Sequence, residues 1–122
     1  MKSRDTLIRL KRFQVDEKKR RVRQIEMMVA EFTRMILDLD REIALEEKRS
    51  GIADPSHFAY PTYARAANTR RENLRSSIQE LQVQISDARA AQDEAQSELE
   101  KFELIEGREK AAERHGELAV GA

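Results

Sequence analysis

The stretch VRQIEMMVAEFTRMILDLDREI, residues 22–43, decides the fold of this chain. Its apolar residues recur without interruption at alternating spacings of three and four, from Val22 to Ile43. A spacing that averages 3.5 residues keeps one stripe of a helix facing a partner helix along its whole length. The stretch therefore predicts one side of a coiled-coil seam.

The same heptad pattern extends toward the N-terminus and returns in the second half of the chain. No Pro or Gly interrupts it between Met1 and Arg49, or between Thr62 and Glu106. The predicted seam of the first half consists of Ile8, Val15, Val22, Ile25, Val29, Phe32, Ile36, Leu39 and Ile43. That of the second half consists of Ala67, Leu74, Ile78, Leu81, Ile85, Ala88, Ala95, Leu99 and Phe102. Two long helices are expected to pack on each other through these stripes.

The segment between the two patterns, SGIADPSHFAYPTYARAA at residues 50–67, differs from the rest of the chain. The chain as a whole is 38% charged and 39% hydrophobic, yet Asp54 is the one charged residue from Ser50 to Ala64. Asp54 followed by Pro55 predicts an N-cap and a short helical turn. Pro61 disfavours helix at the residue before it and can open the next helix. The segment therefore predicts a turn that joins two helices.

Together these patterns predict an all-α fold in which two long helices form one antiparallel coiled-coil hairpin over residues 1–122. The expected parts are a first arm at about 3–49, a tip at about 50–61, a second arm at about 62–106 and a frayed tail at 107–122. The tail is expected because Gly107 and Gly116 interrupt the apolar pattern.

A register follows if facing residues have numbers that sum to 110, as for Val15 and Ala95. This pairing sets the polar Lys18 against Gln92 and folds the chain back at residue 55. A slip by one heptad instead sets Gln92 against Ile25, so the first register is preferred. The charges agree with an antiparallel arrangement, because residues 1–23 hold ten Lys or Arg and three Asp or Glu, whereas residues 86–118 hold five and ten.

Several classes of function find no support in the residues. The chain has no cysteine, and its two histidines, His57 and His115, have no companion at metal-ligand spacing. No phosphate-binding loop or hydrolase motif occurs, and a hairpin of two helices offers little room for a catalytic pocket. We therefore expect no enzyme, no cofactor and no metal. With no signal peptide and no run of about 20 apolar residues, a soluble cytoplasmic protein is expected.

Two groups of residues could bind a partner. Leu7, Leu10 and Phe13 fall outside the seam, and either the seam shifts there or they form an apolar stripe for a partner. The aromatic side chains of the tip, Phe58, Tyr60 and Tyr63, either cover the end of the coiled coil or are presented to a partner.

The basic run Lys18-Lys19-Arg20-Arg21, with Arg23, could bind an acidic membrane surface, or nucleic acid in the manner of a basic zipper. The heptads, however, stop at a break with proline, and the acidic second arm is expected to lie beside the run. An acidic partner within the chain or on another protein is therefore the preferred interpretation.

Two stretches carry a family resemblance, LIRLKRFQVDEKKRRVRQIEMMVAEF at residues 7–32 and HFAYPTYARAANTRRENLRSSIQEL at residues 57–81. In both, the chain resembles the alphaproteobacterial members of the FliJ family of flagellar export proteins. This resemblance implies an antiparallel coiled coil without an active site, which acts as a soluble stalk of the flagellar type III secretion apparatus.

The same resemblance implies the partners and the location. The partners are the export ATPase, the cytoplasmic domain of the export-gate membrane subunit and certain export chaperones, with no nucleic acid. The location is the cytoplasm at the flagellar base, at most peripheral to the inner membrane. The charged ends of the hairpin would meet the ATPase, and Phe58, Tyr60 and Tyr63 would contribute to gate contact.

Overall fold

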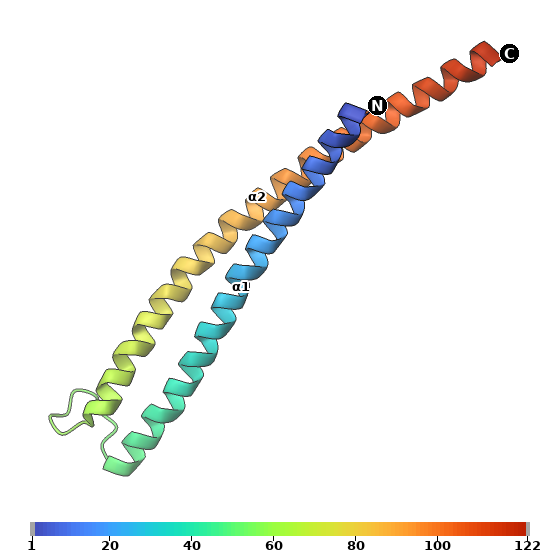
Figure 1. Ribbon diagram of the computed structural model, residues 1–122. Helices are drawn as coiled ribbons and strands as arrows, with labels where there is room; N and C mark the ends of the chain where they lie inside the picture. The colour runs from blue at the N-terminus through green and yellow to red at the C-terminus, as the bar shows by residue number, and fades with distance from the viewer. Residues whose placement is uncertain (1, 122) are drawn as a thin grey trace. The chain divides into compact units, whose positions relative to one another are not determined.

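The computed structural model describes residues 2–121 and contains two long helices joined by a loop (Figure 1). Helix α1 spans Lys2–Ser50 and helix α2 spans Thr62–Gly121. The chain is an all-α helical hairpin, and the described residues contain no strand. The predicted fold class is confirmed.

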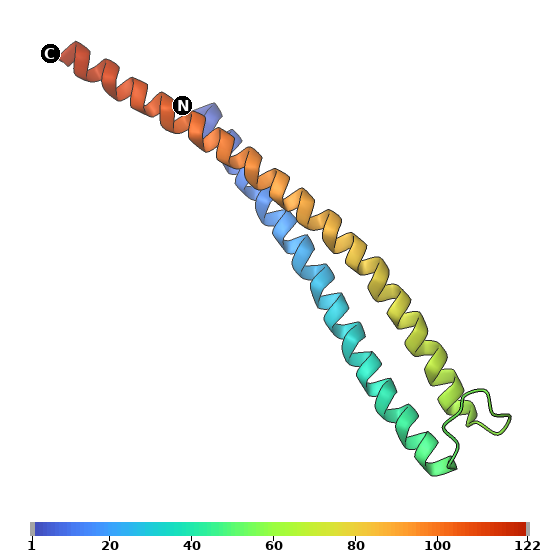
Figure 2. The same cartoon turned by 180° about the vertical axis from the view of Figure 1, so that it is seen from behind.

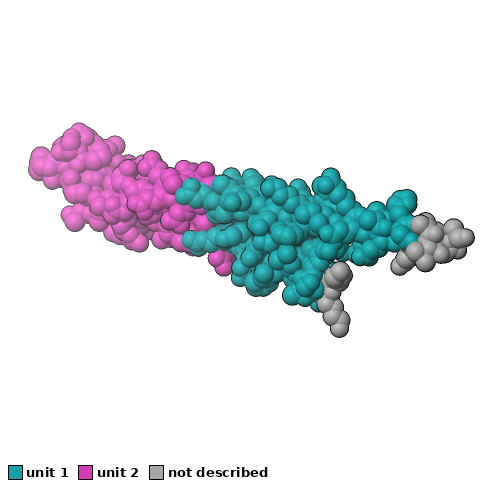
Figure 3. Space-filling model, turned by 90° about the horizontal axis from the view of Figure 1, so that it is seen from above, with its two compact units in different colours: residues 1–22, 87–122 teal, residues 23–86 magenta. Residues whose placement is uncertain are grey.

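The helices divide into two compact units, coloured separately in Figure 3. Unit 1 combines α1 up to Val22 with α2 from Asp87 onward, and unit 2 contains Arg23–Ser86 with the connecting loop. Within each unit the segments of α1 and α2 lie side by side and run in opposite directions, as the two views in Figures 1 and 2 show.

In unit 1 the core joins apolar residues of the two helices at heptad spacing. Ile8, Val15 and Leu99 are buried together, and Ala95 and Phe102 pack against them. Lys11 lies at a seam position of α1, where its ammonium donates a hydrogen bond of 2.7 Å to Glu98 and stands 5.5 Å from the centre of the Phe102 ring. These contacts agree with the register in which facing numbers sum to 110.

In unit 2 the same register holds near the loop. Leu39, Ile43 and Ala67 form a buried cluster, and Leu74 packs against it. Arg71 donates a hydrogen bond of 2.8 Å to Asp40, whereas a slip by one heptad would have set it against Glu46. All the apolar residues of the predicted seam, in both units, are buried or half-buried, whereas the polar seam residue Lys18 is exposed.

The end of α1 and the start of α2 have clear local causes. Gly51 has a φ of 74° and its N–H donates to the carbonyl of Glu47 at 2.9 Å, so a residue without Cβ ends the helix in the left-handed conformation. Lys48 and Arg49 lie in the last turn, where positive charge is favourable. Pro61 precedes α2 and its carbonyl accepts the hydrogen bond from the N–H of Arg65 at 3.0 Å.

The predicted end of the second arm at residue 106, and the frayed tail from 107, are wrong. Helix α2 continues through Gly107 and Gly116 to Gly121. An isolated glycine costs a helix about 1 kcal/mol relative to alanine, which is too little to stop it between good helix formers. Lys110 pairs with Glu106 across Gly107, and Glu109 pairs with Arg4 of α1. These ion pairs support the helix beyond the predicted end.

Candidate functional site

The loop at residues 51–61 is built from two successive turns. In the first, the Asp54 carboxylate accepts hydrogen bonds from the N–H of Ser56 at 2.9 Å and from its hydroxyl at 2.7 Å. The N–H of His57 donates to the carbonyl of Asp54 at 3.0 Å. The Ser56 hydroxyl, followed by the Ser56 N–H, lowers the pKa of the Asp54 carboxyl. Asp54 therefore caps a turn as predicted, but no helix follows it.

The second turn presents Phe58. The N–H of Tyr60 donates to the carbonyl of His57 at 3.0 Å, and the N–H of Ala59 donates to His57 Nδ1 at 3.0 Å. The Phe58 ring stacks on the His57 ring with centroids 4.8 Å apart and remains 94% exposed. An exposed aromatic ring on a hydrogen-bonded turn is a suitable contact for a partner.

Tyr60 does not belong to that exposed group, because its side chain is only 4% exposed. Its ring closes the end of the hairpin, with the Arg65 guanidinium 5.6 Å from the ring centre. The same guanidinium donates hydrogen bonds to the carbonyls of Pro55 at 3.0 Å and His57 at 3.4 Å. The prediction that Tyr60 contacts a partner is therefore wrong, and the residue packs as part of the core.

A sequence signal for this burial existed. Tyr60 lies seven residues before Ala67, and therefore at a seam position if the heptad count is carried back across Pro61. Ala64, between them, is fully buried. The proline break concealed this continuation of the seam into the loop.

A chain of polar contacts runs from the Tyr60 hydroxyl into the interior of unit 2. The hydroxyl donates to Glu47 at 2.9 Å and accepts from the amide of Asn68 at 2.9 Å. The Asn68 amide oxygen accepts from Arg71 at 2.7 Å, and Arg71 donates in turn to Asp40. Arg71 Nε makes no hydrogen bond and lies 3.9 Å from the Glu72 carboxylate. The two terminal nitrogens of Arg71, which the register sets opposite Leu39 at a seam position, are therefore both hydrogen-bonded.

The Tyr60 phenol gives a pH-dependent readout of this network. Burial, and secondarily the hydrogen bond to Glu47, raise its pKa above the ordinary value of 10.0. Because the folded-state pKa is the higher one, the neutral phenol contributes stability that is complete below pH 10 and is lost as the pH rises through the folded pKa. We expect a Tyr63→Phe variant to ionise its remaining tyrosine above pH 10 and to lose stability in that range, measured by tyrosinate absorbance and by urea unfolding. Ionisation of Tyr60 at its ordinary pKa would contradict the burial.

Tyr63 lies at the start of α2 and is about half exposed. Its hydroxyl donates a hydrogen bond of 2.8 Å to Glu42 of α1, which is also the main reason that its pKa is raised. Tyr63 therefore links the two helices while one face of its ring stays accessible to a partner.

The apolar residues at the start of α1 lie in unit 1 and divide by burial. Leu7 is half-buried, whereas Leu10 and Phe13 are each about half exposed. The guanidinium of Arg20, one heptad along, lies 5.9 Å from the centre of the Phe13 ring. Leu10 and Phe13 therefore form an accessible apolar surface next to the basic run of α1.

Ion pairs between the helices of unit 1 match the expected charge pattern. Lys11 pairs with Glu98 at 2.7 Å, and Arg12 lies 3.7 Å from Glu103. Further along α1, Lys18, Lys19 and Arg20 are exposed. Among residues 3–116, no group of three or more acidic or histidine side chains could hold a metal ion. Over the same range, neither helix carries an apolar stretch able to cross a membrane.

Comparison with known proteins adds no relative. No protein-family model, no curated protein and no solved structure matches this chain.

Proposed function

We propose that this chain is a non-enzymatic stalk or adaptor of the flagellar type III protein export apparatus, which binds the export ATPase and the export gate. The resemblance of residues 7–32 and 57–81 to the FliJ family supports this proposal, together with a fold of the kind that the family uses. The observation that carries it is the pair of accessible surfaces on this hairpin, Leu10 with Phe13 in unit 1 and Phe58 in unit 2.

The apolar surface of unit 1 is the proposed contact for the ATPase. Leu10 and Phe13 lie on α1 and expose about half of each side chain, and neighbouring basic residues offer charge to an acidic partner. Phe58 is the proposed contact for the cytoplasmic domain of the gate subunit, and the half-exposed Tyr63 at the start of α2 would contribute to it. Tyr60 acts indirectly in this scheme, by holding the loop that carries Phe58.

We expect the double variant Leu10→Ser, Phe13→Ser to bind the export ATPase at least about tenfold more weakly, since aromatic side chains are enriched at interfaces and Leu10 extends the apolar contact area of Phe13. The measurements are a pull-down with the ATPase from the same source and its rate of ATP hydrolysis with and without this chain. The matched control is Met27→Ser, which removes an exposed apolar side chain from unit 2.

Circular dichroism tells lost binding from lost folding, because neither Leu10 nor Phe13 is buried. Wild-type binding by the double variant would show that another surface meets the ATPase. No association of the unaltered chain with the ATPase, and no change in hydrolysis, would reject the stalk function itself.

There are two alternatives. One is a structural coiled-coil protein that dimerises through parallel heptads, and the other is a zipper that binds nucleic acid and dimerises through the same heptads. Both alternatives need the seam to face a second chain. In each unit that seam is buried between α1 and α2 of the same chain. The hairpin therefore favours an adaptor that binds partners through its outer surface.

A further inference from the structure

Helix α2 carries a second stripe with heptad spacing, to one side of the seam. In unit 1 this outer stripe consists of Asp87, Ala90, Glu94, Ser97, Lys101, Leu104, Arg108 and Ala111, flanked by Ala91 and Ile105. Leu104 is 57% exposed and Ile105 is 45% exposed. Small and apolar residues at the outward positions of a helix so rich in charge are unusual, because such positions normally hold solvated charges.

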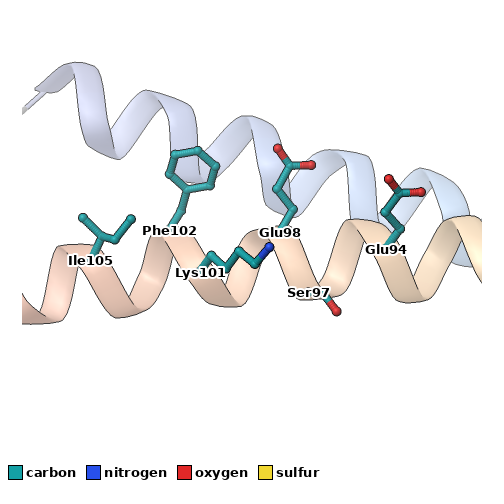
Figure 4. Close-up of a pocket in the computed structure, with 6 residues that line it drawn as sticks. All are labelled: Glu94, Ser97, Glu98, Lys101, Phe102 and Ile105. Carbon is teal, nitrogen blue, oxygen red and sulfur yellow. The ribbon is translucent and has the colours of Figure 1, made fainter.

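The stripe contains a groove in its middle. Glu94, Ser97, Glu98, Lys101, Phe102 and Ile105 line it. Figure 4 shows Phe102, Glu98 and Glu94 directed to the side of α2 on which α1 lies, whereas Ser97 points away from α1. Glu98 already forms an ion pair with Lys11 of α1. The charges on the stripe that could pair with another molecule are therefore those of Asp87, Glu94, Lys101 and Arg108.

Those charges have a self-complementary order. Asp87 and Glu94 precede Ser97, and Lys101 and Arg108 follow it, each seven residues from the next of its own sign. None of the four takes part in an ion pair or a side-chain hydrogen bond among the residues that the structure describes. The pattern is symmetric about a point next to Ser97, which carries a small side chain.

We propose that the outer stripe binds a second copy of this chain, with the two α2 helices antiparallel and Ser97 near the twofold axis. In that arrangement Glu94 faces Lys101 of the second copy and Asp87 faces its Arg108, and each pair occurs twice because the interface is isologous. A parallel arrangement would set like charges against each other. Alanine and serine between the charged residues let the helices approach closely, and Leu104 and Ile105 gain burial.

A single-helix interface is small, so the dimer is weak, reversible and sensitive to salt. The test is sedimentation equilibrium of the full chain over a range of concentrations at low salt. Each of the single variants Glu94→Lys and Lys101→Glu is expected to raise the dissociation constant about tenfold, because it turns two attractive pairs into two repulsive ones. The double variant restores the wild-type value to within about threefold, because it exchanges the two charges.

The matched control is Asp93→Lys, which makes the same change in net charge outside the stripe and is expected to leave the dimer unchanged. Both Glu94 and Asp93 are exposed, so circular dichroism should be the same for all variants. Failure of the double variant to restore association would overturn the proposed pairing.

Disulfide cross-linking tests the orientation, because the natural chain has no cysteine. We expect Ser97→Cys to form a covalent dimer under mild oxidation and Ala111→Cys not to form one, since residue 111 lies far from the axis in the antiparallel pair. Equal cross-linking of both variants would show a parallel pair. A monomer at every concentration, with no cross-link at Ser97→Cys, would reject the interface. None of these outcomes depends on whether the chain binds the export ATPase.

Discussion

Replacing Ile25 with alanine is expected to lower the free energy of unfolding by about 3 kcal/mol, within the usual range for a buried isoleucine. Ile25 is 1% exposed and is the largest fully buried side chain among the described residues. The register sets Ile85 of α2 opposite it. Removing its outer carbons loses their burial and leaves a void that two packed helices can fill only in part.

Urea unfolding followed by helical circular dichroism measures this loss as a lower midpoint with an unchanged slope. The matched control is Met27→Ala, two residues away and 71% exposed, for which we expect a change within about 0.5 kcal/mol. Similar effects for the two variants would mean that the seam is not the main source of stability in unit 2.

Replacing Tyr60 with alanine is expected to destabilise the hairpin by about 3 kcal/mol, as for other buried aromatic residues. Two losses combine in this variant. The ring that closes the end of unit 2 is removed, and Glu47 and Asn68 lose the hydroxyl that joins them. Tyr60→Phe separates these effects, since it keeps the ring and loses only the hydrogen bonds, at a cost of about 1 kcal/mol.

Phe58→Ala is the control for the loop, because its exposed ring contributes little to folding and a change within about 0.5 kcal/mol is expected. Thermal and urea unfolding of the three variants give the comparison. If Phe58→Ala unfolded as easily as Tyr60→Ala, the loop conformation described above would be incorrect, and the assignment of Phe58 as a free contact for the gate would fail with it.

The heptads of residues 22–43 predicted α1 and its seam, because a period of 3.5 residues is a property of the sequence itself. The antiparallel partner followed from the heptads of the second half, the turn between the two patterns and the distribution of charge. The position of the loop could also be predicted from the sequence, since Pro55, Pro61 and Gly51 have strong local conformational preferences. The end of α2 could not be predicted in this way. Isolated glycines weaken a helix without ending it when ion pairs, such as that of Glu109 with Arg4, stabilise the surrounding turns.

The candidate site was predicted less well than the fold. The composition of the turn does not tell inward from outward rings, so the heptad position of Tyr60, seven residues before Ala67, was the one sequence feature that could separate it from Phe58 and Tyr63. Their separate roles depend on tertiary contacts, such as Arg65 with the loop carbonyls and Glu42 with Tyr63. The polar network around Arg71 depends in the same way on residues distant in sequence.

The contacts of Arg71 also restrict how unit 2 can move under load. Sliding one helix past the other by a heptad would carry the guanidinium about 10 Å along α1. It would leave Asp40 of α1 behind, whereas Asn68 lies on the same helix as Arg71 and would move with it. The register of unit 2 is therefore held by a polar contact as well as by its apolar cluster, because a slip would have to break the hydrogen bond between Arg71 and Asp40.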